Sequence, residues 1–168
     1  GGTVKSVAKV LDRLLPAGDI VSAEYNDGKV EVLEVSDAVE LNLPIVVLAN
    51  EKTISAAELF AQAIKDYNKG KVVGTTTYGK GLMQTIHQLT DGSAIEITIG
   101  KYNPPKSPNF NGVGVKPDFE VKLTTDQEKL FEFLNENTDL QFKKAQEVLA
   151  ASVKSKSESS SSSSSSTS

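Results

Sequence analysis

An apolar run that leads into a serine at the start of a helix constrains this chain more than any other feature. The run is Ile45–Ala49, and beyond Ser55 apolar side chains recur at helical spacing as far as Tyr67. Short apolar runs bounded by turn residues are typical of buried strands, and a 3.6-residue spacing is typical of a helix. The sequence therefore predicts a strand that turns sharply into a helix over residues 55–68. A side chain at such a turn lies beside the free amides and the positive dipole end of the helix.

The remaining segments alternate between the patterns of strands and of helices. An amphipathic helix is expected over Val4–Leu15, with Thr3 as its N-terminal cap. Asp-Gly turn signals predict two hairpins, over residues 20–35 and 84–101, and Gly70 is expected to end the central helix in a left-handed conformation. The other expected strands and helices are Lys71–Thr77, Phe119–Leu123, Asp126–Asn135 and Leu140–Ala151. Strand pairs that alternate with helices define an α/β fold class.

Composition narrows the chemistry that such a fold can perform. The chain has 168 residues, enough for one domain with a sizeable core, and its net charge of −4 gives no reason to expect nucleic acid as a partner. It has no cysteine, which excludes disulfides and a thiol nucleophile, and its single histidine is His87. We find no cluster of metal-ligand residues, so no metal site is expected. No apolar segment reaches the length of about 20 residues that spans a bilayer.

Ser55 and Lys80 are the two residues whose surroundings suggest chemistry. Ser55-Ala56-Ala57-Glu58 is first of all a capping box, in which the serine only accepts an amide hydrogen bond. Thr53 is a second candidate cap, and its use would leave Ser55 free. Lys80 lies between two glycines, where a lysine is usually a solvated charge. A lysine acts as a base only when neutral, and because the reference pKa of lysine is about 10.4, that role needs apolar surroundings.

Together these motifs resemble those of the tail-specific, or C-terminal processing, serine peptidases. The family pattern Thr-x-Ser-Ala-Ala/Ser-Glu is matched by residues 53–58, and the pattern Gly-Lys-Gly-x-x-Gln by residues 79–84. Residues 91–94 and 112–118 are further matches, and the likeness covers roughly residues 1–123. Ile54 departs from the family pattern, which more often has a small residue at this position.

The resemblance implies a mechanism and a fold. Ser55 would be the nucleophile, Lys80 its base, and Gln84 the residue that orients the lysine amine. The amides of Gly2 and Ala56 would form the oxyanion hole. The reaction would be cleavage of proteins near their C-terminus through an acyl-enzyme, with no cofactor. The fold would be the crotonase-like (Clp protease-like) core of repeated ββα units, a mixed sheet with flanking helices.

Two alternatives remain open. A Ser-His-Asp triad would have to use His87, which on a strand points to the face opposite Gln84. A non-catalytic peptide-binding or scaffolding module could keep the same fold and hold an extended peptide at a strand edge.

The resemblance also divides the chain and suggests its partners. Residues 1–123 would form the peptidase core, residues 124–154 a C-terminal helical segment, and residues 155–168 a serine-rich tail that we expect to be disordered. Gly1 and Gly2 resemble the end of a family loop, so upstream strands and a PDZ domain are expected in a further portion of the same protein. The expected partners are this portion and a protein or peptide substrate, and a homo-oligomer is possible. The expected location is extracytoplasmic: periplasmic, cell-envelope or secreted.

Overall fold

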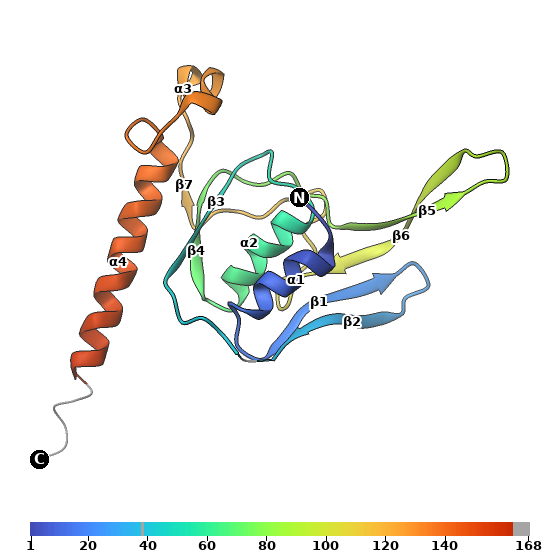
Figure 1. Ribbon diagram of the computed structural model, residues 1–168, viewed down its shortest axis with the longest axis horizontal. Coiled ribbons are helices and arrows are strands. Elements are labelled where there is room, and N and C mark those ends of the chain that lie inside the picture. The colour runs from blue at the N-terminus through green and yellow to red at the C-terminus, as the bar shows by residue number, and fades with distance from the viewer. Residues whose placement is uncertain (38, 163–168) are drawn as a thin grey trace, which may run out of the picture.

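The strands form two separate sheets instead of the single mixed sheet expected from the sequence. The antiparallel sheet has the order β2-β1-β6-β5, and the parallel sheet has the order β3-β4-β7. The strands are β1 (Gly18–Tyr25), β2 (Val30–Ser36), β3 (Ile45–Ala49), β4 (Gly70–Gly74), β5 (Leu82–Gln88), β6 (Ala94–Asn103) and β7 (Phe119–Glu120). The computed structural model shown in Figure 1 describes residues 1–37 and 39–162, with side chains as far as Lys154. This is a mixed α/β fold.

The helices start within one residue of the expected positions and end at different residues. They are α1 (Val4–Asp12), α2 (Ala56–Asp66), α3 (Thr125–Lys129), a 3-10 turn (Phe131–Phe133) and α4 (Leu140–Ser162). Thr3 caps α1 as predicted, since its hydroxyl accepts the Ser6 amide at 3.1 Å. None of the helices in the part of the chain that the structure describes is both long and apolar enough to cross a membrane.

Helix α4 continues into the serine-rich tail, which was predicted to be disordered from Ser155. Its backbone is helical as far as Ser162, and residues 163–168 lie outside the described residues. Once a helix is nucleated, each further residue adds a hydrogen bond, and serine lowers helix propensity only modestly. The prediction of disorder was therefore wrong for the first part of this tail.

The parallel sheet packs between two layers of helix. Val72 belongs to the main core, together with residues of α1 and α2 such as Leu11 and Leu59. Val73, the next residue on β4, packs with Ala145 of α4 on the opposite face. β3 is an edge strand of this sheet, so the run predicted to be a buried strand is exposed in part.

Gly70 is needed because the backbones of β3 and β4 approach closely there, and it does not end helix α2. The left-handed residue after α2 is Asn68, with φ 51°, so the predicted role of Gly70 as the helix stop was wrong. A Cβ on Gly70 would lie 2.4 Å from the carbonyl oxygen of Ile45 on the neighbouring strand. The glycine thus allows β3 and β4 to pair where they begin.

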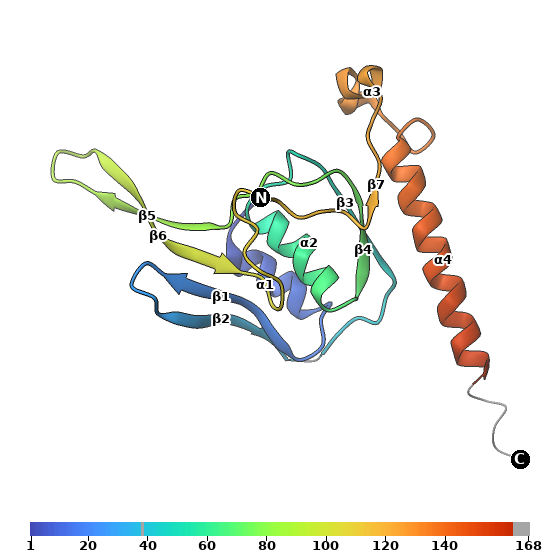
Figure 2. The same cartoon turned by 180° about the vertical axis from the view of Figure 1, so that it is seen from behind.

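The two predicted hairpins are present and join into one sheet. β1 pairs with β2, β5 pairs with β6, and β1 pairs with β6 from Ser22↔Asn103 to Tyr25↔Gly100. Both hairpins extend to the side of the molecule opposite α4, as Figures 1 and 2 show. The pairing of β1 with β6 brings Tyr102 beside Ala23, at the base of the sheet next to the helices.

Candidate active site

Ser55 lies in a strained turn between β3 and α2. Its φ of 63° and ψ of −127° are rare for residues other than glycine, and such a conformation costs about 1–3 kcal/mol. Thr53 closes the turn, because its hydroxyl accepts the Asn50 amide at 3.0 Å and its amide donates to the Asn50 carbonyl at 2.8 Å. Thr53 is therefore not the helix cap that the sequence allowed. A serine in a strained strand-to-helix turn is the arrangement that exposes a nucleophile at a sheet edge.

The buried carboxylate of Glu58 links this turn to the loop that contains Lys80. Glu58 is 0% exposed. Its Oε2 accepts the amides of Ser55 and Lys80, both at 2.8 Å. Its Oε1 accepts the Gly79 amide at 2.6 Å and the Thr77 hydroxyl at 2.5 Å. The capping-box arrangement is kept through Glu58, while the Ser55 hydroxyl makes no cap hydrogen bond of its own.

Lys80 belongs to the loop between β4 and β5, whose path depends on its flanking glycines. Gly79 has φ +91°, and a Cβ there would lie 2.9 Å from the Gly114 nitrogen. A Cβ on Gly81 would lie 2.7 Å from the Asn109 side chain. The Lys80 side chain is half-buried. Among the described residues no carboxylate lies within ion-pairing distance of its amine, and the amine makes no hydrogen bond to Ser55 Oγ.

Gln84 and His87 are exposed on β5. Neither side chain makes a hydrogen bond within the ranges that the structure describes, so neither contacts Ser55 or Lys80 in this way. A register shift separates Met83 from Gln84 in the pairing with β6. Irregularities of this kind bend a strand and re-aim its side chains, and they are frequent beside active sites.

Tyr102 is a neighbour of Ser55 that the sequence did not indicate. It is 2% exposed on β6, its hydroxyl donates to the Lys80 carbonyl, and the same hydroxyl makes a second, longer contact of 3.4 Å with Ser55 Oγ. Burial raises the pKa of Tyr102 to about 12, the Ser55 hydrogen bond opposes this rise, and the charge of Glu58 adds to it. No local pattern could have identified it, because the contact depends on the pairing of β6 with two other strands.

Gly2 and Ala56 border one cavity of about 700 Å³ beside the start of α2. The cavity wall is mainly apolar and is formed by α1, β3, α2 and the 3-10 turn, with the side chains of Val7, Val10, Val47, Leu48, Phe60 and Phe131. The two residues expected to form an oxyanion hole therefore lie at the same cavity. Its lining suits an apolar group.

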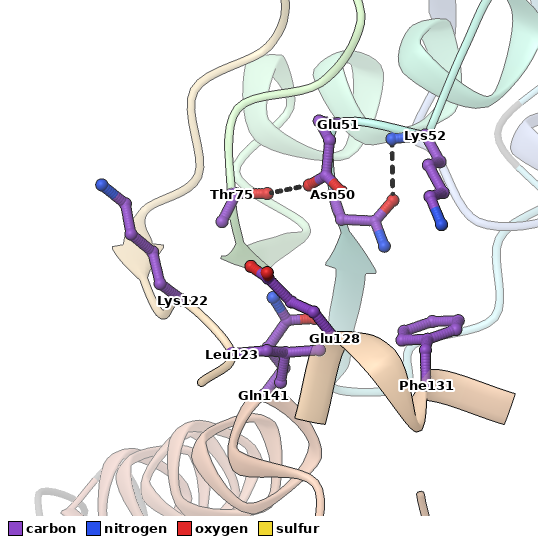
Figure 3. A pocket seen from close by; sticks show the side chains of 9 residues that line it. All are labelled: Asn50, Glu51, Lys52, Thr75, Lys122, Leu123, Glu128, Phe131 and Gln141. Carbon is purple, nitrogen blue, oxygen red and sulfur yellow. Dashed lines mark hydrogen bonds between the residues drawn. The ribbon is translucent and has the colours of Figure 1, made fainter. Parts of the chain in front are cut away.

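A second cavity, of about 530 Å³, opens at the carboxyl end of the parallel sheet (Figure 3). Glu51 lies here and accepts a hydrogen bond from the Thr75 hydroxyl at 3.0 Å. Glu51 and Glu58, the two carboxylates close to Ser55 in sequence, are thus both bonded to groups other than the Lys80 amine. In the part of the chain that is described, no group of three or more His, Cys, Asp and Glu side chains could hold a metal ion.

Comparison with known proteins identifies the family. Residues 1–121 match the family described as Peptidase family S41. The chain is 37% identical over 131 residues to carboxyl-terminal-processing peptidase 1 of Arabidopsis thaliana, a match that covers 77% of this chain and 27% of the relative. It is 30% identical over 155 residues to a carboxyl-terminal-processing protease of Synechocystis, covering 91% of this chain and 35% of the relative. The chain belongs to peptidase family S41.

A solved structure agrees with this assignment. The photosystem II D1 C-terminal processing protease superposes with a TM-score of 0.66 and 35% sequence identity, over 76% of this chain and 34% of that protein. The chain spans 27% of the Arabidopsis relative and 35% of the Synechocystis relative, so it corresponds to about a third or less of their length.

Proposed function

We propose that this chain is the catalytic core of a serine endopeptidase that cuts protein substrates near their C-terminus, with Ser55 as nucleophile and Lys80 as base. The observation that carries the proposal is the link through Glu58. One buried carboxylate joins the strained Ser55 turn to the Lys80 loop, and no carboxylate of the described residues pairs with the lysine amine. An ion pair would hold that amine protonated and prevent it from acting as a base. Membership of family S41 and the names of the relatives support the reaction.

The reaction follows from these roles. The Lys80 amine takes the proton of Ser55 Oγ, and Oγ bonds to the substrate carbonyl carbon. The C–N bond then breaks, and the leaving amine takes the proton from Lys80. Water gives a proton to Lys80 and bonds to the carbonyl carbon of the resulting ester. The bond from this carbon to Oγ then breaks, Oγ takes the proton back from Lys80, and the product leaves as a carboxylic acid. The Lys80 amine makes no hydrogen bond to Ser55 Oγ among the described residues, and catalytic hydrogen bonds of this kind tighten when substrate binds.

Three further residues complete the proposed site. The amides of Gly2 and Ala56, which border one cavity, donate to the oxyanion, and donors of this kind contribute about 3 kcal/mol each. Gln84 accepts a hydrogen bond from the Lys80 amine through its side-chain carbonyl and so directs the amine toward Ser55. The register shift beside Gln84 supports this role, because irregularities of this kind re-aim side chains beside active sites.

The proposal extends to fold, partners and location. β2 and β3 are followed along the chain by α2, and this order supports a ββα unit of a crotonase-like core. We propose residues 1–123 as the peptidase core and residues 124–154 as a helical addition. Besides the protein substrate, the proposed partners are a further portion of the same protein that contains a PDZ domain and a second copy of the chain. The site of action is extracytoplasmic.

Covalent labelling tests the proposal against a non-catalytic peptide-binding module. The full-length protein is treated with a serine-directed phosphonate, and the modified residue is located by mass spectrometry. Modification of Ser55 that disappears in Ser55→Ala supports the peptidase. A protein that binds peptides but whose Ser55 stays unmodified would be a binding module.

A further inference from the structure

We propose that Tyr102 acts in the reaction of Ser55: its hydroxyl, anchored on the Lys80 carbonyl, donates to Ser55 Oγ as that oxygen gains negative charge. The inference rests on the proposed peptidase function. It concerns a residue that lies on β6, outside both sequence motifs.

The first support is the position of the Tyr102 hydroxyl between the two reacting segments. It contacts Ser55 Oγ at 3.4 Å and the Lys80 carbonyl oxygen at a shorter distance. A phenol has one proton, and a carbonyl oxygen can only accept. The proton therefore lies mainly on the Lys80 side at rest, and the long contact to Ser55 is the weaker one. When Lys80 removes the Ser55 proton, Oγ becomes the stronger acceptor, and the donor strengthens its bond to that atom.

The second support is the rigidity of the tyrosine. Its amide donates to the Gly81 carbonyl at 3.2 Å, and the Asn109 side chain donates to the Tyr102 carbonyl at 2.8 Å. Its ring meets Phe110 edge-on, with 5.7 Å between the ring centroids. A donor held by its backbone and by its ring needs no reorganisation when charge develops, which is the property of an effective electrostatic catalyst.

The third support is that packing does not require the hydroxyl. A phenylalanine would fill the same place in the core and keep the edge-on contact with Phe110. The hydroxyl also stays protonated at physiological pH, since burial raises the pKa of Tyr102 to about 12. Tyr102 is thus suited to donate to Ser55 and unsuited to replace Lys80 as the base.

The test compares Tyr102→Phe with Tyr25→Phe in the full-length protein. Tyr25 lies at the far end of β1, and within the described residues its hydroxyl makes no hydrogen bond. We measure the rate of phosphonate labelling at Ser55, the kcat and KM for a peptide substrate, and the thermal midpoint. Tyr102→Phe should lower the labelling rate and kcat by about ten- to a hundredfold, with KM nearly unchanged. Tyr25→Phe should leave all these quantities at the wild-type level.

A second variant changes the acidity of the Tyr102 hydroxyl without removing it. Tyr102→fluorotyrosine keeps the hydroxyl but ionises at lower pH, so labelling should decline at a lower alkaline pH than in the wild type. The thermal midpoint is measured at each pH, because a residue that only packs would give no such shift while the protein stays folded. Wild-type labelling in Tyr102→Phe together with an unshifted profile for the fluorotyrosine variant would overturn the inference and leave the peptidase proposal intact. A wild-type protein never labelled at Ser55 would overturn both.

Discussion

Oε2 of Glu58 accepts the backbone amide of Lys80 at 2.8 Å, although 22 positions separate the two residues in the sequence. The same oxygen accepts the amide of Ser55. One carboxylate thus sets the distance between the backbone of the nucleophile turn and that of the base loop. It bonds the backbone of Lys80 and does not pair with the amine of that residue.

Glu58→Gln should destabilise the protein and lower the reactivity of Ser55. An amide group offers one acceptor oxygen, while four donors face the native carboxylate. A buried mismatch of this kind should lower the free energy of unfolding by about 2–4 kcal/mol, measured in urea. Glu96→Gln, on the exposed surface of β6, is the matched control and should change stability little. Equal stability of the two variants would contradict the role given to Glu58.

Lys80→Ala should reduce turnover by about a thousandfold or more, because the reaction loses its base. Lys80→Arg should not restore the rate, since a guanidinium stays protonated. His87→Ala should leave the rate nearly unchanged, because His87 is exposed on β5. Peptide hydrolysis by the full-length protein is the measurement. Loss of activity in His87→Ala with activity kept in Lys80→Ala would show that the Ser-Lys mechanism is wrong.

Gln84→Ala should lower kcat by up to about a hundredfold if Gln84 orients the Lys80 amine, because small errors in geometry are costly in an active site. The fold should stay intact, since the Gln84 side chain is exposed. Gln88→Ala, also exposed on β5, is the control for the strand surface. Steady-state kinetics on a peptide substrate separates the two variants, and an unchanged kcat in Gln84→Ala would remove Gln84 from the mechanism.

Gly79→Ala should destabilise the protein more than Gly92→Ala does. Both glycines have left-handed backbones, with φ +91° and +86°, so both variants lose about 1–2 kcal/mol to backbone strain. Only the Cβ at position 79 meets other atoms, 2.9 Å from the Gly114 nitrogen, whereas position 92 is open. Overpacking should add about 1–3 kcal/mol at position 79. Urea unfolding of both variants measures this difference, and equal losses would mean that the loop adapts freely.

The stability of the protein should decrease in alkaline solution because of Tyr102. Burial raises its pKa from 10.0 to about 12, so its folded-state pKa exceeds the unfolded value. The stabilising contribution is then complete below pH 10 and is lost as the pH rises toward 12. Over this range the free energy of unfolding of the wild type should fall by up to about 2 kcal/mol more than that of Tyr102→Phe. Urea unfolding at several pH values measures how the free energy of unfolding of each protein depends on pH. The same dependence in both proteins would show that Tyr102 does not cause the loss.

Local signals in the sequence determined the existence and order of most strands and helices. The apolar run of β3, the Thr3 cap of α1 and the Asp-Gly turn of each hairpin depend on residues a few positions apart, and each was predicted correctly. The two motifs around Ser55 and Lys80 were visible for the same reason, since each is a short run of neighbouring residues.

The tertiary structure alone decided how these pieces meet. The sequence showed Glu58 as one half of a capping box, but only folding buries it against the amides of Gly79 and Lys80. Tyr102 reaches Ser55 because β6 pairs with β1 and β5. Contacts of this kind join residues that are distant along the chain, and no periodic pattern encodes them. They form because a buried carboxylate and a buried phenol must each find hydrogen-bond partners in the folded core.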